Sequence, residues 1–177
     1  SYSGERDTFV PAPDLVHTDW GTGFWIEREA PPLADEKMRA ASGRDKDAVI
    51  RAGTGHHGIS SLWTFIYPTP DIKIHQYLYE TPIDSGHTSL YLVNLRNFML
   101  EPEHDERMMY RNENTAAQDR DVLMDVRPTL TPESRTKELF VPSDRAIAAY
   151  RDKISEWQAR GWRIDASTVE QKRLKVA

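Results

Sequence analysis

The segment from Glu103 to Pro128 constrains the fold of this chain more than any other stretch of its 177 residues. Read as a helix, it carries a stripe with the i, i+3, i+4, i+7 spacing of a core-facing surface. The stripe consists of Asn112, Ala116, Asp119, Leu123 and Val126, with Val122 beside it. Its apolar end predicts burial, yet Asp119 places a carboxylate in it. A buried ionised carboxylate is costly unless it is paired, hydrogen-bonded or bound to a metal, so we expect Asp119 to have a partner.

Two kinds of partner fit Asp119 at this point. One is a salt bridge to an arginine such as Arg96 or Arg127, which the helix alone favours. The other is a metal ion, which needs support from the rest of the sequence.

Composition excludes several classes of function. Hydrophobic residues make up 38% of the chain and charged residues 29%, which is typical of a globular protein. A net charge of −5 without a basic run argues against nucleic acid and anionic membrane as partners. The absence of cysteine excludes disulfides, thiolate catalysis and cysteine-ligated clusters within this chain. No apolar run is long enough to span a membrane, and the first residues lack the apolar segment of a signal peptide, so we expect a cytoplasmic protein. The missing initial methionine suggests a piece of something longer.

The first two thirds of the chain predict mainly strands. His17–Glu29 resembles a hairpin, with Phe24–Arg28 as its surer strand, and Leu33–Ile50 predicts one or two short exposed helices. We interpret the glycine-rich segment Arg51–Ser60 as a turn. Three strands in a meander are expected to follow, at Leu62–Tyr67, Ile72–Tyr79 and Thr88–Phe98.

The last third predicts helices. After the Glu103–Pro128 helix comes an extended crossing with a possible edge strand at Lys137–Val141. Ser143 is a suitable N-cap for a final helix that ends at Gly161. The stripe expected to be buried on this helix is Ile147, Tyr150, Ile154 and Trp157. Strands first and helices after predict one α+β domain, in which a curved antiparallel sheet grips a long helix (a helix-grip, START-like fold) and encloses a site for a small apolar or aromatic ligand.

The histidines do not by themselves form a metal motif. None of the six pairs at i, i+4 on a helix, and there is no HExxH. His56 and His57 are neighbours that point apart in the expected turn, so a surface role is favoured. His75 shares a strand face with Tyr77, where it either hydrogen-bonds a ligand or is a satisfied histidine at the edge of the core.

Three segments resemble the C-terminal catalytic domain of Rieske non-heme iron ring-hydroxylating oxygenases of the phthalate dioxygenase and vanillate O-demethylase kind. These segments are ETPIDSGHTSLYLVNLRNF (80–98), QDRDVLMDVRP (118–128) and VPSDRAIAAYRDKISEW (141–157). Arg127 departs from the family's usual glutamine, and the first eighty residues carry no motif that matches.

The resemblance implies a mononuclear Fe(II) held by two histidines and one aspartate, with open positions for O2. Asp119 matches that aspartate, and Asn112 on the same stripe becomes a candidate hydrogen-bond partner behind the iron ligands. The two histidines and the Rieske [2Fe–2S] domain would precede this chain. The chain would then be a catalytic-domain fragment (1–177), inactive alone because one carboxylate cannot hold Fe(II).

The implied activity is hydroxylation or O-demethylation of an aromatic, carboxylated substrate, with electrons from NAD(P)H through a reductase and a homotrimeric assembly. Candidate substrate-binding residues are Trp63, His75 and Tyr77. The alternative is a stand-alone helix-grip module that binds a small apolar ligand without a metal.

Overall fold

The computed structural model describes residues 12–29, 49–84, 86–129 and 135–162. They belong to two compact units, one formed by residues 1–95 with 141–177 and the other by residues 96–140, and each is described by itself. The helices expected within Leu33–Ile50 fall almost wholly outside the described residues, as does the end of the chain.

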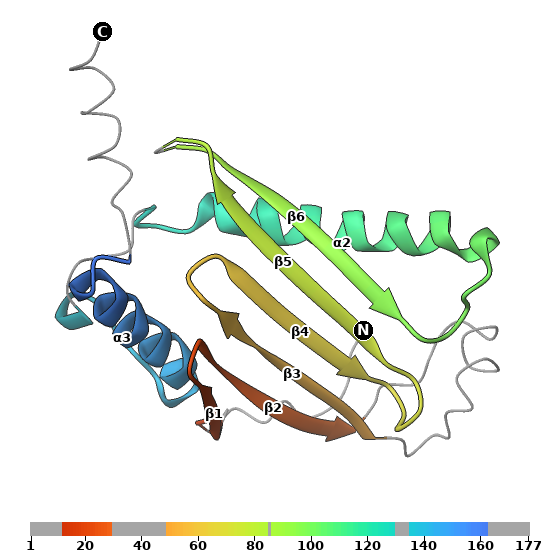
Figure 1. Cartoon of the computed structure of the whole chain (residues 1–177), viewed down its shortest axis with the longest axis horizontal. Helices are drawn as coiled ribbons and strands as arrows, with labels where there is room; N and C mark the ends of the chain where they lie inside the picture. Colours follow the sequence, from red (N-terminus) through yellow and green to blue (C-terminus); the bar gives the residue numbers. More distant parts are fainter. Residues whose placement is uncertain (1–11, 30–48, 85, 130–134, 163–177) are drawn as a thin grey trace, which may run out of the picture. The chain divides into compact units, whose positions relative to one another are not determined.

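A six-stranded sheet dominates the first unit, with its strands in sequence order across the sheet (Figure 1). The strands are β1 (Leu15–Thr18), β2 (Gly21–Glu29), β3 (Val49–His57), β4 (Ser61–Tyr67), β5 (Ile74–Pro82) and β6 (Thr88–Arg96). The pairs from β1 to β5 are antiparallel. The expected hairpin and meander are therefore confirmed, and the curved antiparallel sheet with its helices is an α+β fold consistent with the helix-grip type.

The prediction that the glycine-rich segment is a turn is wrong, because most of this segment forms β3 at the centre of the sheet. Its glycines leave room for indole rings that lie close against the strand. A Cβ atom on Gly53 would come within 2.6 Å of the Trp25 ring, and one on Gly55 within 2.7 Å of the Trp63 ring. Glycine in a strand can mark such a close approach rather than a chain reversal.

The final helix is confirmed as α3 (Arg145–Ala159), which follows a 3-10 turn, η3 (Pro142–Asp144). Asp144 rather than Ser143 is its N-cap, and the left-handed Gly161 (φ 73°) follows its end. Trp157 is buried, with 3% of its surface exposed, whereas Ile147 at the other end of the stripe is 51% exposed.

Helix α3 packs at the β1–β2 end of the sheet (Figure 1). Tyr150 and Ile154 are half-buried there, and the Tyr150 hydroxyl donates to the Ile59 carbonyl at 2.7 Å. The expected stripe is therefore buried at Trp157 and half-buried at Tyr150 and Ile154, and its expected burial at Ile147 is wrong.

The second unit consists of a 3-10 turn, η1 (Pro102–His104), the long helix α2 (Asp105–Asp125) and a second 3-10 turn, η2 (Arg135–Lys137). The expected long helix is confirmed, and it ends before Pro128. The possible edge strand at Lys137–Val141 is wrong: Lys137 ends η2, and no strand follows it before η3. Within the described part of the chain, no helix is both long enough and apolar enough to cross a membrane.

The close packing of the indoles on β3 predicts that Gly55→Ala destabilises the protein. The added Cβ would lie 2.5 Å from the Thr22 carbonyl oxygen and 2.6 Å from the Gly23 Cα, and these backbone atoms cannot move aside cheaply. We expect a loss of about 1–3 kcal/mol in the free energy of unfolding, measured by urea denaturation. Gly86→Ala is the control, because its Cβ would meet only Asp84 at 3.6 Å. Equal stability of the two variants would contradict the packing described here.

Candidate functional site

One face of the sheet carries a continuous set of aromatic rings, which we call the aromatic face. Because side chains alternate along a strand and pair across strands, the register places them side by side. Trp63 lies opposite Tyr77, and Phe65 lies opposite His75. The members of the aromatic face are Trp25, Trp63, Phe65, Tyr67, His75 and Tyr77.

The rings of the aromatic face touch in an unbroken series. Phe65 is at its centre, with its ring centroid 4.0 Å from that of His75, 4.9 Å from Trp63 and 5.7 Å from Tyr77. The Trp25 ring lies 6.0 Å from Trp63. These separations are those of favourable stacked and tilted ring pairs. Most of the rings are only half-buried, so the face has apolar area left to bind a flat ring.

A hydrogen bond fixes the His75 imidazole on the aromatic face. The Tyr67 hydroxyl and the His75 Nε2 are 3.2 Å apart, and either the hydroxyl or the imidazole N–H donates, according to the histidine tautomer. His75 is therefore held in place by stacking on Phe65 and by this bond. These contacts fit the alternative of a satisfied histidine at the edge of the core, and they leave the ring beside the surface where a ligand ring would lie.

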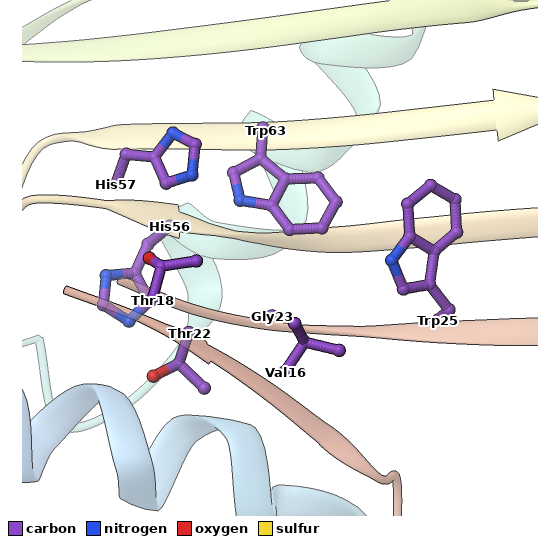
Figure 2. A pocket seen from close by; sticks show the side chains of 8 residues that line it. All are labelled: Val16, Thr18, Thr22, Gly23, Trp25, His56, His57 and Trp63. Carbon is purple, nitrogen blue, oxygen red and sulfur yellow. The ribbon is translucent and has the colours of Figure 1, made fainter. Parts of the chain in front are cut away.

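A small pocket lies at the β1 end of the aromatic face, where Thr18, Trp25, His57 and Trp63 are among the lining residues (Figure 2). Figure 2 shows Trp25 and Trp63 reaching over β3 from the strands on its two sides. The pocket holds only about 40 Å³, which is room for one or two waters and too little for an aromatic ring. The open aromatic face, rather than this pocket, is therefore the candidate surface for a substrate ring.

The opposite face of the sheet holds His56, and here the expectation of a surface histidine is wrong. His56 is 4% exposed, and its ring lies 4.7 Å from Tyr150 and 6.2 Å from Trp157 of α3. The residue was misplaced because the expected turn is a central strand, on which adjacent residues face opposite sides. His57 is accordingly exposed on the other side.

Burial gives His56 an unusual environment. Its Nδ1 lies 3.0 Å from the Gly58 carbonyl oxygen, and its buried Nε2 has no hydrogen-bond partner among the described residues. Removal from water lowers the pKa of His56 below 6.5, and the nearby His57 and Lys153 act in the same direction, against the Gly58 carbonyl.

Asp119 and Asn112 lie on α2, and Asp119 is exposed there. None of the residues of α2 is buried, and Leu123 on the expected core-facing stripe is 67% exposed. The expected burial is therefore not observed. Besides α2, the described part of residues 96–140 contains only short 3-10 turns and connecting segments.

The two arginines considered as ion-pair partners of Asp119 are engaged elsewhere. Arg96 pairs with Asp105 and donates to the Met99 carbonyl. Arg127 donates to the carbonyls of Met124 and Val126 at the end of α2. The ion-pair interpretation of Asp119 thus receives no support from these contacts.

The described residues contain no group of three histidine, cysteine or acidic side chains that could hold a metal ion. The six histidines all lie in the described part of the chain. The donors in this part therefore do not complete an iron site, and Asp119 fits such a site only as one contributor.

Trp63, His75 and Tyr77 are candidates from the sequence, whereas Trp25 and Tyr67, which lie on the same face, are not. The structure brings these five residues together through the strand register. Trp25 could have been placed only if the glycine-rich segment had been recognised as the strand between β2 and β4.

Protonation of His56 is expected to weaken the fold. Below pH 6.5 the unfolded chain binds a proton that the folded state, with its lowered pKa, still excludes, so the free energy of unfolding falls as the pH drops below 6.5. Urea midpoints measured between pH 8 and pH 5 should fall less in His56→Gln than in the wild type, while His57→Gln keeps the wild-type slope. An unchanged slope in His56→Gln would rule out this assignment.

The model of one protein family, the vanillate O-demethylase oxygenase C-terminal domain, matches residues 1–160. The match includes the first eighty residues, where no motif had been found. A search of curated proteins found no match. The match supports the resemblance to the C-terminal domain of an oxygenase of the vanillate O-demethylase kind. An oxygenase uses O2 together with an organic substrate. The chain belongs to the family of vanillate O-demethylase oxygenase C-terminal domains.

Proposed function

We propose that this chain is the C-terminal part of the catalytic domain of a Rieske-type oxygenase that hydroxylates or O-demethylates an aromatic, carboxylated substrate. The observation that carries the proposal is the match to an oxygenase family over residues 1–160. The aromatic face adds independent support, since stacked rings with one fixed imidazole suit a flat organic ligand.

Within this proposal Asp119 supplies one ligand of a mononuclear Fe(II), and two histidines from sequence outside this chain supply the others. Carboxylate and imidazole groups are the ligands of iron centres that activate O2. Activation of O2 is the chemistry that the metal would contribute. One exposed carboxylate binds Fe(II) too weakly to retain it, so the chain alone should not turn over.

Asn112 lies seven residues before Asp119 on α2, about 10 Å away along the helix axis. That separation is too long for a direct hydrogen bond between the two side chains. We assign to Asn112 a bond to another ligand of the iron, whose orientation it would fix.

Trp63, His75 and Tyr77 bind the substrate ring in this proposal. Trp63 and Tyr77 face each other across β4 and β5, and His75 stacks on the neighbouring Phe65. These three side chains orient the substrate ring and exclude water from it, and the His75 imidazole is placed to hydrogen-bond a polar substituent of the ring.

The remaining components lie outside this chain. The iron would receive its electrons from a Rieske [2Fe–2S] cluster, which a reductase would reduce with NAD(P)H. We further propose a cytoplasmic homotrimer, of which residues 1–177 form one part of the catalytic domain, with neither nucleic acid nor membrane as partner.

A metal-free helix-grip module that binds a small apolar ligand is the second candidate. The aromatic face would serve it equally well, and the described residues hold no complete metal group. Iron content separates the two candidates, because only the oxygenase requires the Asp119 carboxylate.

Asp119→Ala in the complete oxygenase subunit is the decisive variant. We expect it to lose the mononuclear iron and product formation while it keeps the visible absorption of the [2Fe–2S] cluster. Total iron by plasma mass spectrometry, together with that spectrum, measures the effect. Because Asp119 is exposed in this structure, its removal should leave the melting temperature nearly unchanged.

Asp121→Ala is the matched control. Asp121 is an exposed carboxylate two residues further along α2, 2.8 Å from the Arg120 guanidinium. It should retain iron and activity. Full mononuclear iron in the Asp119→Ala subunit would disprove the ligand assignment.

A further inference from the structure

Two basic side chains stand at one end of the aromatic face, on either side of Tyr67. Arg51 on β3 lies directly opposite Tyr67 on β4. Lys73 precedes β5, and the pairing of Ile66 with Ile74 brings it opposite Tyr67 from the other side. Arg51, Tyr67 and Lys73 therefore form one row across the sheet.

Both cations lie over rings of the aromatic face. The Arg51 guanidinium carbon is 4.5 Å from the centre of the Trp25 ring, and the Lys73 ammonium nitrogen is 5.8 Å from that of Tyr67. These are cation–π distances, and they hold both positive charges next to the surface on which a substrate ring would stack.

The acidic residue in this row is Glu27, whose carboxylate lies 3.8 Å from the Arg51 guanidinium. Both side chains are more than half exposed, so this ion pair is weak and a ligand carboxylate can compete for the arginine. The opposite end of the face differs, since His57 and Tyr79 occupy its last row on β3 and β5.

We propose that Arg51 and Lys73 bind the carboxylate of an aromatic acid whose ring lies on the aromatic face. The inference deepens the proposed function and rests on it, because it names the charged group that sets substrate choice. A ring on Trp25 and Phe65 would direct a carboxyl substituent toward this row, where the guanidinium can donate two parallel hydrogen bonds. The two residues bind and orient the substrate and take no part in the oxygen chemistry.

The test compares acids with their methyl esters, which keep the ring and lose the charge. Vanillate, benzoate and phthalate and the corresponding methyl esters are titrated by calorimetry into the complete subunit. In Arg51→Gln the Kd for the preferred acid should rise at least about tenfold, as expected for the loss of a charge-assisted hydrogen bond. Lys73→Gln should act in the same direction, and the Kd of the ester should change less than about twofold in both variants.

Arg28→Gln is the matched control. Arg28 is an exposed arginine at the same end of the sheet, one residue beyond Glu27 and so on the opposite face. Its substitution should leave the Kd of every acid unchanged, which separates a local contact from a general loss of positive charge.

The outcomes distinguish this inference from the proposed function. Acid and ester binding that weaken equally in Arg51→Gln would overturn the inference, because the arginine would then only support ring packing. Acid binding that is unchanged in both variants would overturn it as well, while the aromatic ligand of the proposed function would stand. If neither acids nor esters bind the wild-type subunit, both proposals fail.

Discussion

The close packing of two indole rings against the backbone of β3 is the interaction on which the rest of this structure depends. Trp25 reaches over Gly53, and Trp63 reaches over Gly55. Side chains at these positions would lift the rings off the strand. With glycine there, the rings lie close enough to meet Phe65 and so to begin the series that ends at His75 and Tyr77.

This packing divides the sheet into two faces with different tasks. The aromatic face presents half-buried rings bordered by Arg51 and Lys73, whereas the other face packs on α3 through His56, Tyr150 and Trp157. The adjacent pair His56 and His57 shows the division within two residues. The His56 imidazole is buried against the helix and resists protonation, and the His57 imidazole is exposed on the aromatic face.

The elements with strong periodicity could be predicted from the sequence. The hairpin, β4 to β6, α2 and α3 all occur where alternation, helical spacing or prolines placed them. The central strand β3 could not be predicted, because its glycines have no side chain to reveal alternation. Their role is to make room for indole rings from the neighbouring strands. Because β3 was not predicted, Trp25 was not among the candidate site residues and His56 was expected at the surface.

The candidate residues were predictable to different degrees. The shared face of His75 and Tyr77 follows from strand alternation alone, and the structure adds Trp63 opposite Tyr77. Asp119 could be placed on a helix, and its resemblance to an iron ligand came from the surrounding motif. Its expected burial is not observed on α2. Periodicity predicts which residues share a helix face, but it does not predict which element covers that face.

The proposed aromatic-acid oxygenase depends most on Asp119 as an iron ligand. Anomalous diffraction at the iron absorption edge, from crystals of the complete subunit, tests it most directly. We expect a mononuclear iron peak, separate from the [2Fe–2S] cluster, bonded to a carboxylate oxygen of Asp119. A mononuclear iron bound away from Asp119, or an Asp119 carboxylate that contacts only water in iron-loaded crystals, would contradict it.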